Sequence, residues 1–211
     1  MTMDYVKTVR RQKLNLAAAK LAANQFGASV FETKEEAAEF LKQNIPSGSS
    51  VGVGGSLTLD ELSMLEWLRA KPDIRFIDSY AMEDKKQAYR ESLLADVYLM
   101  SSNAVTMDGM LYNVDGTGNR VAALIYGPEK VFVVAGVNKL VRNAQEAKIR
   151  VEETAAPANC ARLKKDNPCV ETGSCMHCSH ASTICNQFVL SRRCGIPGRI
   201  HVILVNEELG L

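Results

Sequence analysis

The sequence has no excess of charge of either sign and no long hydrophobic run. Its 25 lysines and arginines nearly balance 24 aspartates and glutamates, which leaves a formal net charge of +1. No block of like charge stands out, so neither a nucleic-acid surface nor a membrane surface is predicted. The longest uninterrupted apolar runs, such as residues 131–135, are far too short to span a bilayer.

The sequence also lacks a targeting signal, an internal repeat, a low-complexity tract and a linker. Its first five residues, Met-Thr-Met-Asp-Tyr, do not have the basic-then-apolar pattern of a signal peptide, so we expect a cytoplasmic protein. In a reducing compartment the six cysteines favour metal ligation or redox chemistry over structural disulfides. A chain of 211 residues can bury one sizeable core, so residues 1–211 are predicted to form a single domain.

Apolar segments of strand length alternate with helical segments along the chain. The strand candidates are 28–31, 50–53, 74–77, 97–100, 130–135, 187–190 and 200–205. The helical candidates are 4–26, which Gly27 should end, a helix between Thr33 and Pro46, and 59–69, 83–94, 119–126 and 143–153. The strands lack polar alternation, so we expect an α/β fold with a mainly parallel sheet and helices on both faces.

Two segments interrupt this alternation. Asp108-Gly109 lies between two short apolar arms within 104–112, which predicts an extra β-hairpin. Residues 155–186 show little periodicity and hold four of the six cysteines, which predicts a cysteine-rich loop near the C-terminus.

A glycine-rich segment runs from a predicted strand directly into a predicted helix. Thr58 and Glu61 have the spacing of a capping box, so the helix should begin near Leu59. Backbone N–H groups at such a helix start attract anions. The predicted binding residues for phosphate, pyrophosphate or carboxylate are Gly54, Gly55, Ser56, Leu57 and Thr58. A tight strand-to-helix connection is the alternative, because the segment is neither a Walker loop nor a complete G-x-G-x-x-G motif.

The stretch from 101 to 120 follows a strand, so it lies at an edge where α/β sheets bind ligands. Its candidate catalytic residues are Asp108, Asn113, Asp115, Thr117, Asn119 and Arg120. Arg120 in the first turn of a helix opposes the helix dipole, unless it holds an anion or a carboxylate such as Asp115. Turn chemistry alone is the alternative for the two Asp-Gly pairs, at 108–109 and 115–116.

Four cysteines have the spacing C-x5-C-x2-C-x6-C, in which the central C-x2-C can direct two sulfurs at one centre. The predicted metal ligands are Cys169, Cys175, Cys178 and Cys185. Soft thiolates select zinc or an iron–sulfur cluster; a 4Fe–4S cluster is favoured, and zinc is the alternative.

The neighbouring residues leave other arrangements open. His177 and His180 are candidate replacement ligands, whereas Cys160 and Cys194 fall outside the spacing. Disulfides would require oxidation, and a thioredoxin-like pair normally opens a helix after a strand, which this context does not show.

Three motifs together resemble the LUD domain of lactate-utilisation proteins: Val51-Gly-Val-Gly-Gly-Ser-Leu-Thr, Ala104-Val-Thr-Met-Asp-Gly and Asp115-Gly-Thr-Gly-Asn-Arg-Val-Ala-Ala. Ala156-Pro-Ala-Asn and the ending Arg199-Ile-His-Val-Ile-Leu-Val extend the similarity over nearly the whole chain. The resemblance implies the fold shared by glucosamine-phosphate deaminases, ribose-phosphate isomerases and CoA transferases. It also implies partner subunits in a system that oxidises lactate to pyruvate.

Part of the same stretch is similar to sugar-phosphate isomerase relatives of the initiation-factor-2B family, whose corresponding loop lies beside the substrate. The matching positions are Asp108, Gly109, Asn113, Gly116 and Thr117. No segment matches the glutamate motif of CoA transferases.

Three functions follow from these patterns. The first is a component of lactate or organic-acid utilisation that binds a small anionic ligand and a metal or iron–sulfur centre. The second is an isomerase-like or acyl-transfer enzyme for a small phosphorylated or carboxylate substrate. The third is a non-catalytic ligand-binding subunit with a structural zinc. An oligomer is compatible with all three.

Overall fold

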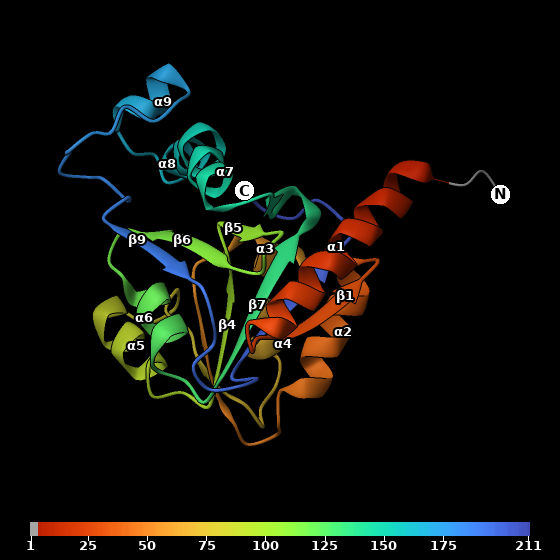
Figure 1. The fold of residues 1–211 in the computed structure, drawn as a ribbon. Helices are drawn as coiled ribbons and strands as arrows, with labels where there is room; N and C mark the ends of the chain where they lie inside the picture. The colour runs from red at the N-terminus through yellow and green to blue at the C-terminus, as the bar shows by residue number, and fades with distance from the viewer. Residues whose placement is uncertain (1–3) are drawn as a thin grey trace.

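The main sheet has six strands and is parallel throughout (Figure 1). The computed structural model describes residues 4–211. The sheet consists of β1 (Gly27–Phe31), β2 (Ser50–Val53), β3 (Arg75–Ile77), β4 (Val97–Ser101), β7 (Lys130–Gly136) and β10 (Ile200–Val205). Their order is β1-β10-β7-β4-β2-β3, and every neighbouring pair is parallel. The predicted mainly parallel α/β sheet is therefore confirmed.

Helices cover both faces of this sheet. They are α1 (Tyr5–Ala23), α2 (Lys34–Asn44), α3 (Leu57–Glu61), α4 (Met64–Arg69), α5 (Lys85–Ser92) and α6 (Asn119–Ile125). Val131 and Val133 of β7 pack with α1 and α6, whereas Phe132 and Val134 pack with α2, α3 and α4. Because successive strand residues point to opposite faces, this division explains why the strands carry apolar side chains without polar alternation.

The first helix ends earlier than predicted. Asp4 caps its start by accepting hydrogen bonds from the N–H groups of Val6 and Lys7. The chain then turns at Gln25, which has a φ of +65°. Gly27 was predicted to end the helix, but it begins β1 instead. A Cβ atom at this glycine would lie 2.5 Å from Nδ1 of His201 on the neighbouring strand, so close strand packing explains the residue.

The helix after the glycine loop also differs from the prediction. Ser56, not Thr58, is its N-cap, because the Ser56 hydroxyl accepts a hydrogen bond from the N–H of Leu59. The predicted helix 59–69 is split into α3 and α4 at Ser63, which adopts a φ of +52°. The side chain of Thr58 is buried instead and contacts Lys139.

A second sheet lies across the carboxyl ends of the main strands (Figure 1). Its strands, in the order β8-β5-β6-β9, are β8 (Leu140–Val141), β5 (Ala104–Thr106), β6 (Leu111–Asp115) and β9 (Gln187–Ser191). β5 and β6 form the predicted hairpin, with Gly109 at φ +82° in its turn. β9 was expected in the main sheet, but it pairs antiparallel with β6. Its exposed Phe188 and Leu190 mark it as a one-sided edge strand.

The predicted loop at 155–186 is partly helical. The 3₁₀ turn η1 (Val137–Lys139) precedes β8. A continuous helical run follows β8 and consists of α7 (Ala144–Arg150), the π-helical η2 (Val151–Ala155) and α8 (Ala156–Arg162). A short α9 (Pro168–Thr172) follows, so the irregular parts cover only 163–167 and 173–186. The first half of the run corresponds to the predicted helix 143–153. Its continuation from 155 onward was missed because the buried face there is built from small residues, among them Ala155, Ala156 and Cys160. Within residues 4–211, no helix combines the length and apolarity that a membrane crossing requires.

Candidate functional site

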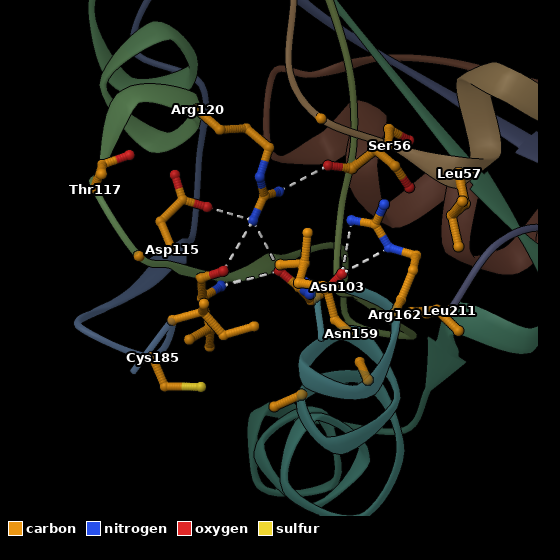
Figure 2. A pocket seen from close by; sticks show the side chains of 18 of the residues that line it. Ser56, Leu57, Asn103, Asp115, Thr117, Arg120, Asn159, Arg162, Cys185 and Leu211 are labelled. Atoms are coloured by element: carbon orange, nitrogen blue, oxygen red, sulfur yellow. Dashed lines mark hydrogen bonds and ion pairs between the residues drawn. The ribbon is translucent and has the colours of Figure 1, made fainter. Parts of the chain in front are cut away.

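A cavity of about 540 Å³ lies between the carboxyl edge of the main sheet, the second sheet and the helical run 144–162 (Figure 2). Its wall includes the glycine loop, the segment after β4, the end of β6 and the start of α6. Helix α8 contributes Asn159 and Arg162, and η1 contributes Lys139. Ligands of parallel α/β sheets bind at this edge.

The glycine loop reaches the cavity with three of its five predicted residues. Gly55, Ser56 and Leu57 line the wall, where the first turn of α3 has backbone N–H groups without intrahelical acceptors. Gly54 lies behind them, and a Cβ atom there would be 3.0 Å from the Arg120 side chain. Thr58 is also behind the wall and is 1 % exposed. An anion contact at this loop remains a prediction.

Arg120 organises the opposite wall. Its guanidinium is 2.6 Å from Oδ1 of Asp115 and donates to the backbone oxygen of Ser101 and the side-chain oxygen of Asn103 (Figure 2). The other carboxylate oxygen of Asp115 accepts a hydrogen bond of 3.0 Å from the N–H of Val121. The ion pair therefore explains why a cation, Arg120, stands at the start of α6. The sequence pattern predicted that it would hold an anion or a carboxylate such as Asp115.

The remaining polar candidates are divided. Thr117 and Asn119 line the cavity and are joined by a hydrogen bond of 2.7 Å. Asn113 is fully buried and accepts a hydrogen bond from Arg120, while its Nδ2 has no hydrogen-bond partner in the described part of the chain. Asp108 lies apart in the hairpin turn, where its carbonyl oxygen accepts from Asn24 after α1. The structure thus separates Asp108 from the other candidates.

Lys139 is a wall residue that the sequence analysis missed. It is 4 % exposed, and its Nζ donates to the hydroxyls of Thr58 and Ser101, each at 2.9 Å. Burial, together with the positive charges of Arg150 and Arg120, lowers the pKa of Lys139 to about 7. Its only signal in the sequence is a polar residue shortly after an apolar strand.

The cavity wall carries far more positive than negative side chains. Its cationic residues are Lys85, Arg120, Lys139, Arg162 and Lys165, and its one acidic side chain, Asp115, is paired with Arg120. Arg162 donates two hydrogen bonds, of 3.0 and 2.8 Å, to the side-chain oxygen of Asn159 (Figure 2). These hydrogen bonds involve no carboxylate. This excess of cations suits an anionic ligand.

Beside the cavity, four cysteines lie close to one another. The thiols of Cys169, Cys185 and Cys178 are near enough to that of Cys160 to influence its pKa. Burial raises the pKa of Cys160 to about 12, and these neighbouring thiols add to the effect. Burial and the thiols of Cys175, Cys169 and Cys178 also raise the pKa of Cys185, to about 11. Cys185 itself lines the cavity.

Cys178 differs from its neighbours in the direction of its pKa shift, and Cys194 lies apart from all of them. The N–H of His180 and the side chain of Asn167 donate to Cys178 and lower its pKa, as suits a thiolate. Cys194 lies in the core beneath α1 and donates to the carbonyl of Ile196. The structure therefore brings Cys160, which the spacing excluded, to the predicted ligands and keeps Cys194 away. Cys160 is not part of the cysteine motif because it lies on the preceding helix, α8.

The comparisons with known proteins agree with this architecture. The model of the LUD domain family, which is associated with lactate utilisation, matches residues 14–205. The chain is also similar to the crystal structure of a DUF162 family protein from Deinococcus radiodurans, with a TM-score of 0.53 and 16 % identity. That match covers 93 % of this chain and 98 % of the other, and it shows a shared fold. No curated protein matches the chain. Because the family model spans nearly the whole sequence, this protein belongs to the LUD domain family.

Proposed function

We propose that this chain is a component of organic-acid utilisation that binds a small carboxylate, such as lactate or pyruvate, in the cavity at the sheet edge. The observation that carries the proposal is the excess of cationic side chains in the wall: Lys85, Arg162 and Lys165 lie there besides Lys139, and the one acidic side chain, Asp115, is paired with Arg120. A volume of about 540 Å³ lies within the range of small-molecule sites. It also leaves room for a second reactant or a group from a partner subunit.

The wall offers distinct partners for the two ends of a 2-hydroxy or 2-oxo acid. Arg162 has an exposed guanidinium at the mouth, and the N–H groups of Gly55 and Leu57 lie nearby in the wall, so together they suit the carboxylate. Lys139 lies deeper, between two hydroxyls, and suits the oxygen on the neighbouring carbon. Asp115 and Arg120 fix the wall by their mutual contact, which leaves Asp115 less free to act as a base.

We also infer a metal centre in the cysteine segment, with Cys169, Cys175, Cys178 and Cys185 as the ligands predicted from the spacing. Around one zinc ion, with Zn–S bonds of about 2.3 Å, the sulfurs would lie about 4 Å apart. Among residues 4–211, no three cysteine sulfurs lie within 4.8 Å of one another. A 4Fe–4S cluster binds each thiolate to a different iron, so it does not require sulfurs this close together. When bound, such a cluster would supply one-electron transfer beside the cavity, because Cys185 belongs to both.

The two alternative functions have less support. Isomerase-like or acyl-transfer chemistry often uses a carboxylate as base or nucleophile, and the one acidic side chain of the described wall, Asp115, is paired with Arg120. A structural zinc held by four thiolates would need sulfurs about 4 Å apart, and no three cysteine sulfurs among residues 4–211 lie within 4.8 Å of one another. Partner subunits and a cytoplasmic location stay expectations from the sequence and the resemblance.

Calorimetric titration with lactate, pyruvate and inorganic phosphate tests the anion proposal. Propane-1,2-diol, the uncharged analogue of lactate, should not bind. Arg162→Gln should weaken carboxylate binding at least about tenfold, or about 1.4 kcal/mol. Arg90→Gln, which changes an exposed arginine outside the cavity wall, is the matched control and should bind as wild type does. Absence of binding by all three anions, or equal binding by both variants, would contradict the proposal.

A further inference from the structure

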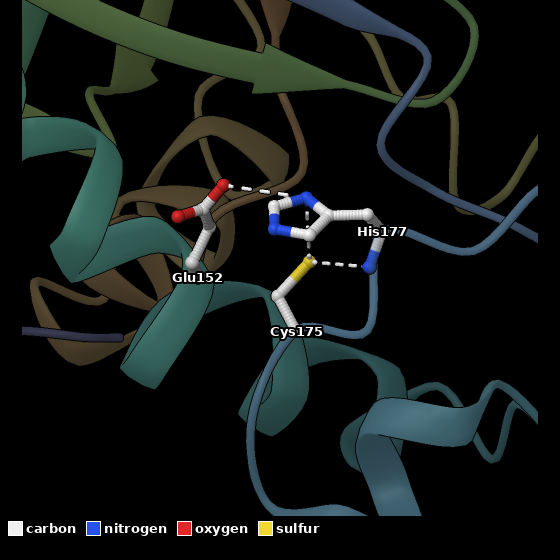
Figure 3. Close-up of side chains that lie close together, drawn as sticks. All are labelled: Glu152, Cys175 and His177. Carbon is white, nitrogen blue, oxygen red and sulfur yellow. Dashed lines mark hydrogen bonds and ion pairs between the residues drawn. The ribbon is translucent and has the colours of Figure 1, made fainter.

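Three potential metal ligands meet on the outer side of the helical run, apart from the cavity (Figure 3). Glu152 comes from η2, and Cys175 and His177 come from the irregular segment after α9. Their ligand atoms all lie within 4.8 Å of one another. Nδ1 of His177 is 3.6 Å from Oε1 of Glu152 and 4.0 Å from Sγ of Cys175.

These distances are close to those of a tetrahedral ion. With metal–nitrogen and metal–oxygen bonds of about 2.1 Å and a metal–sulfur bond of about 2.3 Å, a tetrahedron separates nitrogen and oxygen by about 3.4 Å. The same geometry separates nitrogen and sulfur by about 3.6 Å. The two observed separations, 3.6 and 4.0 Å, exceed these values by only a few tenths of an ångström. The third pair, Glu152 and Cys175, lies within 4.8 Å, so side-chain adjustments of up to about 1 Å close the site on an ion.

The backbone holds the three residues in this arrangement. The N–H of Cys175 donates to the carbonyl oxygen of Glu152 at 3.0 Å, which fixes the irregular segment to the helix. The N–H of His177 donates to the sulfur of Cys175 at 3.4 Å. His177 has a φ of +48°, which is uncommon outside glycine and turns its ring back toward the other two ligands. Glu152 itself lies in a π-helical segment, a feature that occurs frequently at functional sites.

We infer that Glu152, Cys175 and His177 bind a single divalent ion of the zinc class. A sulfur, a nitrogen and a carboxylate oxygen suit a borderline ion, whereas calcium and magnesium prefer oxygen ligands alone. Three protein ligands leave one position for water or a substrate, as in catalytic zinc sites. The side chain of His177 is 71 % exposed, so the position opens to solvent.

The site formed by Glu152, Cys175 and His177 is distinct from the proposed anion site, and the two sites share no ligand residue. Val151 and Ala155 of η2 line the cavity, but Glu152 lies between them and does not. Cys175 can bind only one centre at a time. With Cys175 in this trio, a four-sulfur centre would take its fourth ligand from Cys160, whose thiol lies near those of Cys169, Cys178 and Cys185.

Titration of the full chain with Co²⁺ tests the inference, after chelator treatment under reducing conditions. In a Cys169→Ser chain, which lacks the four-sulfur centre, we expect one equivalent to give the strong visible bands of a tetrahedral ion and the near-ultraviolet band of a single thiolate ligand. Glu152→Gln and His177→Gln should each weaken binding at least tenfold. The matched controls Glu153→Gln and His180→Gln change neighbouring residues outside the trio and should bind as wild type does.

Cys169→Ser separates this site from the four-sulfur centre. We expect it to keep the Co²⁺ bands, and all variants to keep the wild-type far-UV spectrum and, measured without metal, the wild-type lactate affinity. Wild-type Co²⁺ binding by Glu152→Gln and His177→Gln would overturn the inference. Loss of the bands in a folded Cys169→Ser variant would do so too, because the ion would then lie among the cysteines. Neither outcome bears on the anion site, which the lactate titration tests separately.

Discussion

Replacing Lys139 with methionine should stabilise the fold near neutral pH while it impairs anion binding. The amine is 4 % exposed and its pKa is lowered from 10.5 to about 7. At about 1.4 kcal/mol per pKa unit, holding the charged form in the fold costs about 5 kcal/mol below pH 7 and about 4 kcal/mol at pH 7. Loss of the two hydrogen bonds to Thr58 and Ser101 offsets about 2 kcal/mol of this. A net stabilisation of about 2 kcal/mol at pH 7 remains.

The sign of the pH dependence provides the sharper test. Between pH 7 and 10.5 the unfolded chain binds a proton at Lys139 that the folded chain has released, so wild-type stability rises with pH. The variant lacks this contribution. Its advantage should therefore shrink as pH rises and disappear near pH 9, where the cost in wild type has fallen to about 2 kcal/mol and equals the loss of the two hydrogen bonds.

Urea unfolding of both proteins at pH 7, 8 and 9.5 gives the difference in unfolding free energy, from which groups common to both proteins cancel. Calorimetry with lactate at pH 7 measures the loss of binding, expected to be at least about tenfold. A Lys139→Met variant that is less stable than wild type by the same amount at every pH would refute the reasoning. The lysine would then be a structural hydrogen-bond donor that carries no burial cost.

Three further variants test other features of the fold. Burial lowers the pKa of His201 from 6.5 to about 4. The free energy of unfolding should therefore fall by up to about 3 kcal/mol as the pH is lowered from 6.5 to 4, and His201→Gln should flatten this pH dependence in urea unfolding. Asp115→Asn leaves the guanidinium of Arg120 without its carboxylate and should cost about 3–5 kcal/mol; a wild-type denaturation midpoint would show that the amide partners suffice. Gly109→Ala should lower the thermal midpoint, because φ is +82° and the new Cβ would lie 2.5 Å from the carbonyl carbon of Lys20; an unchanged midpoint would mean that the hairpin turn shifts freely.

The main sheet was predictable because its strands are buried on both faces. A run such as 130–135 must be apolar at every position, and this pattern is visible without any knowledge of the partners. β9 shows where that reasoning ends. Its residues are apolar enough for a strand, but the choice between two sheets depends on pairing with β6, which lies more than seventy residues earlier. Helix α8 was missed for a different reason, because its buried face is formed by small side chains.

The site was only partly predictable from the sequence. Motifs identified the glycine loop and the stretch from Asp115 to Arg120, which are each continuous in sequence and line one cavity. Lys139 and Arg162 carry no motif, since a single cation after a strand or at a helix end is common on any surface. Only the packing of η1 and α8 against the sheet edge makes them wall residues. Cys160 was missed similarly, because its nearness to Cys169 arises from the turn between α8 and α9.

The helical run from Ala144 to Arg162 has two sides with different contacts, and this has a thermodynamic consequence. Val151 and Ala155 contact the cavity, while Glu152 points outward to Cys175 and His177. Any shift of η2 that a bound carboxylate favours also moves Glu152 relative to its two partners. By linkage, a carboxylate that raises the affinity for the ion by some factor must have its own affinity raised by the ion by the same factor. The π-helical segment would then couple the two sites, and measuring either affinity with and without the other ligand gives the coupling free energy directly.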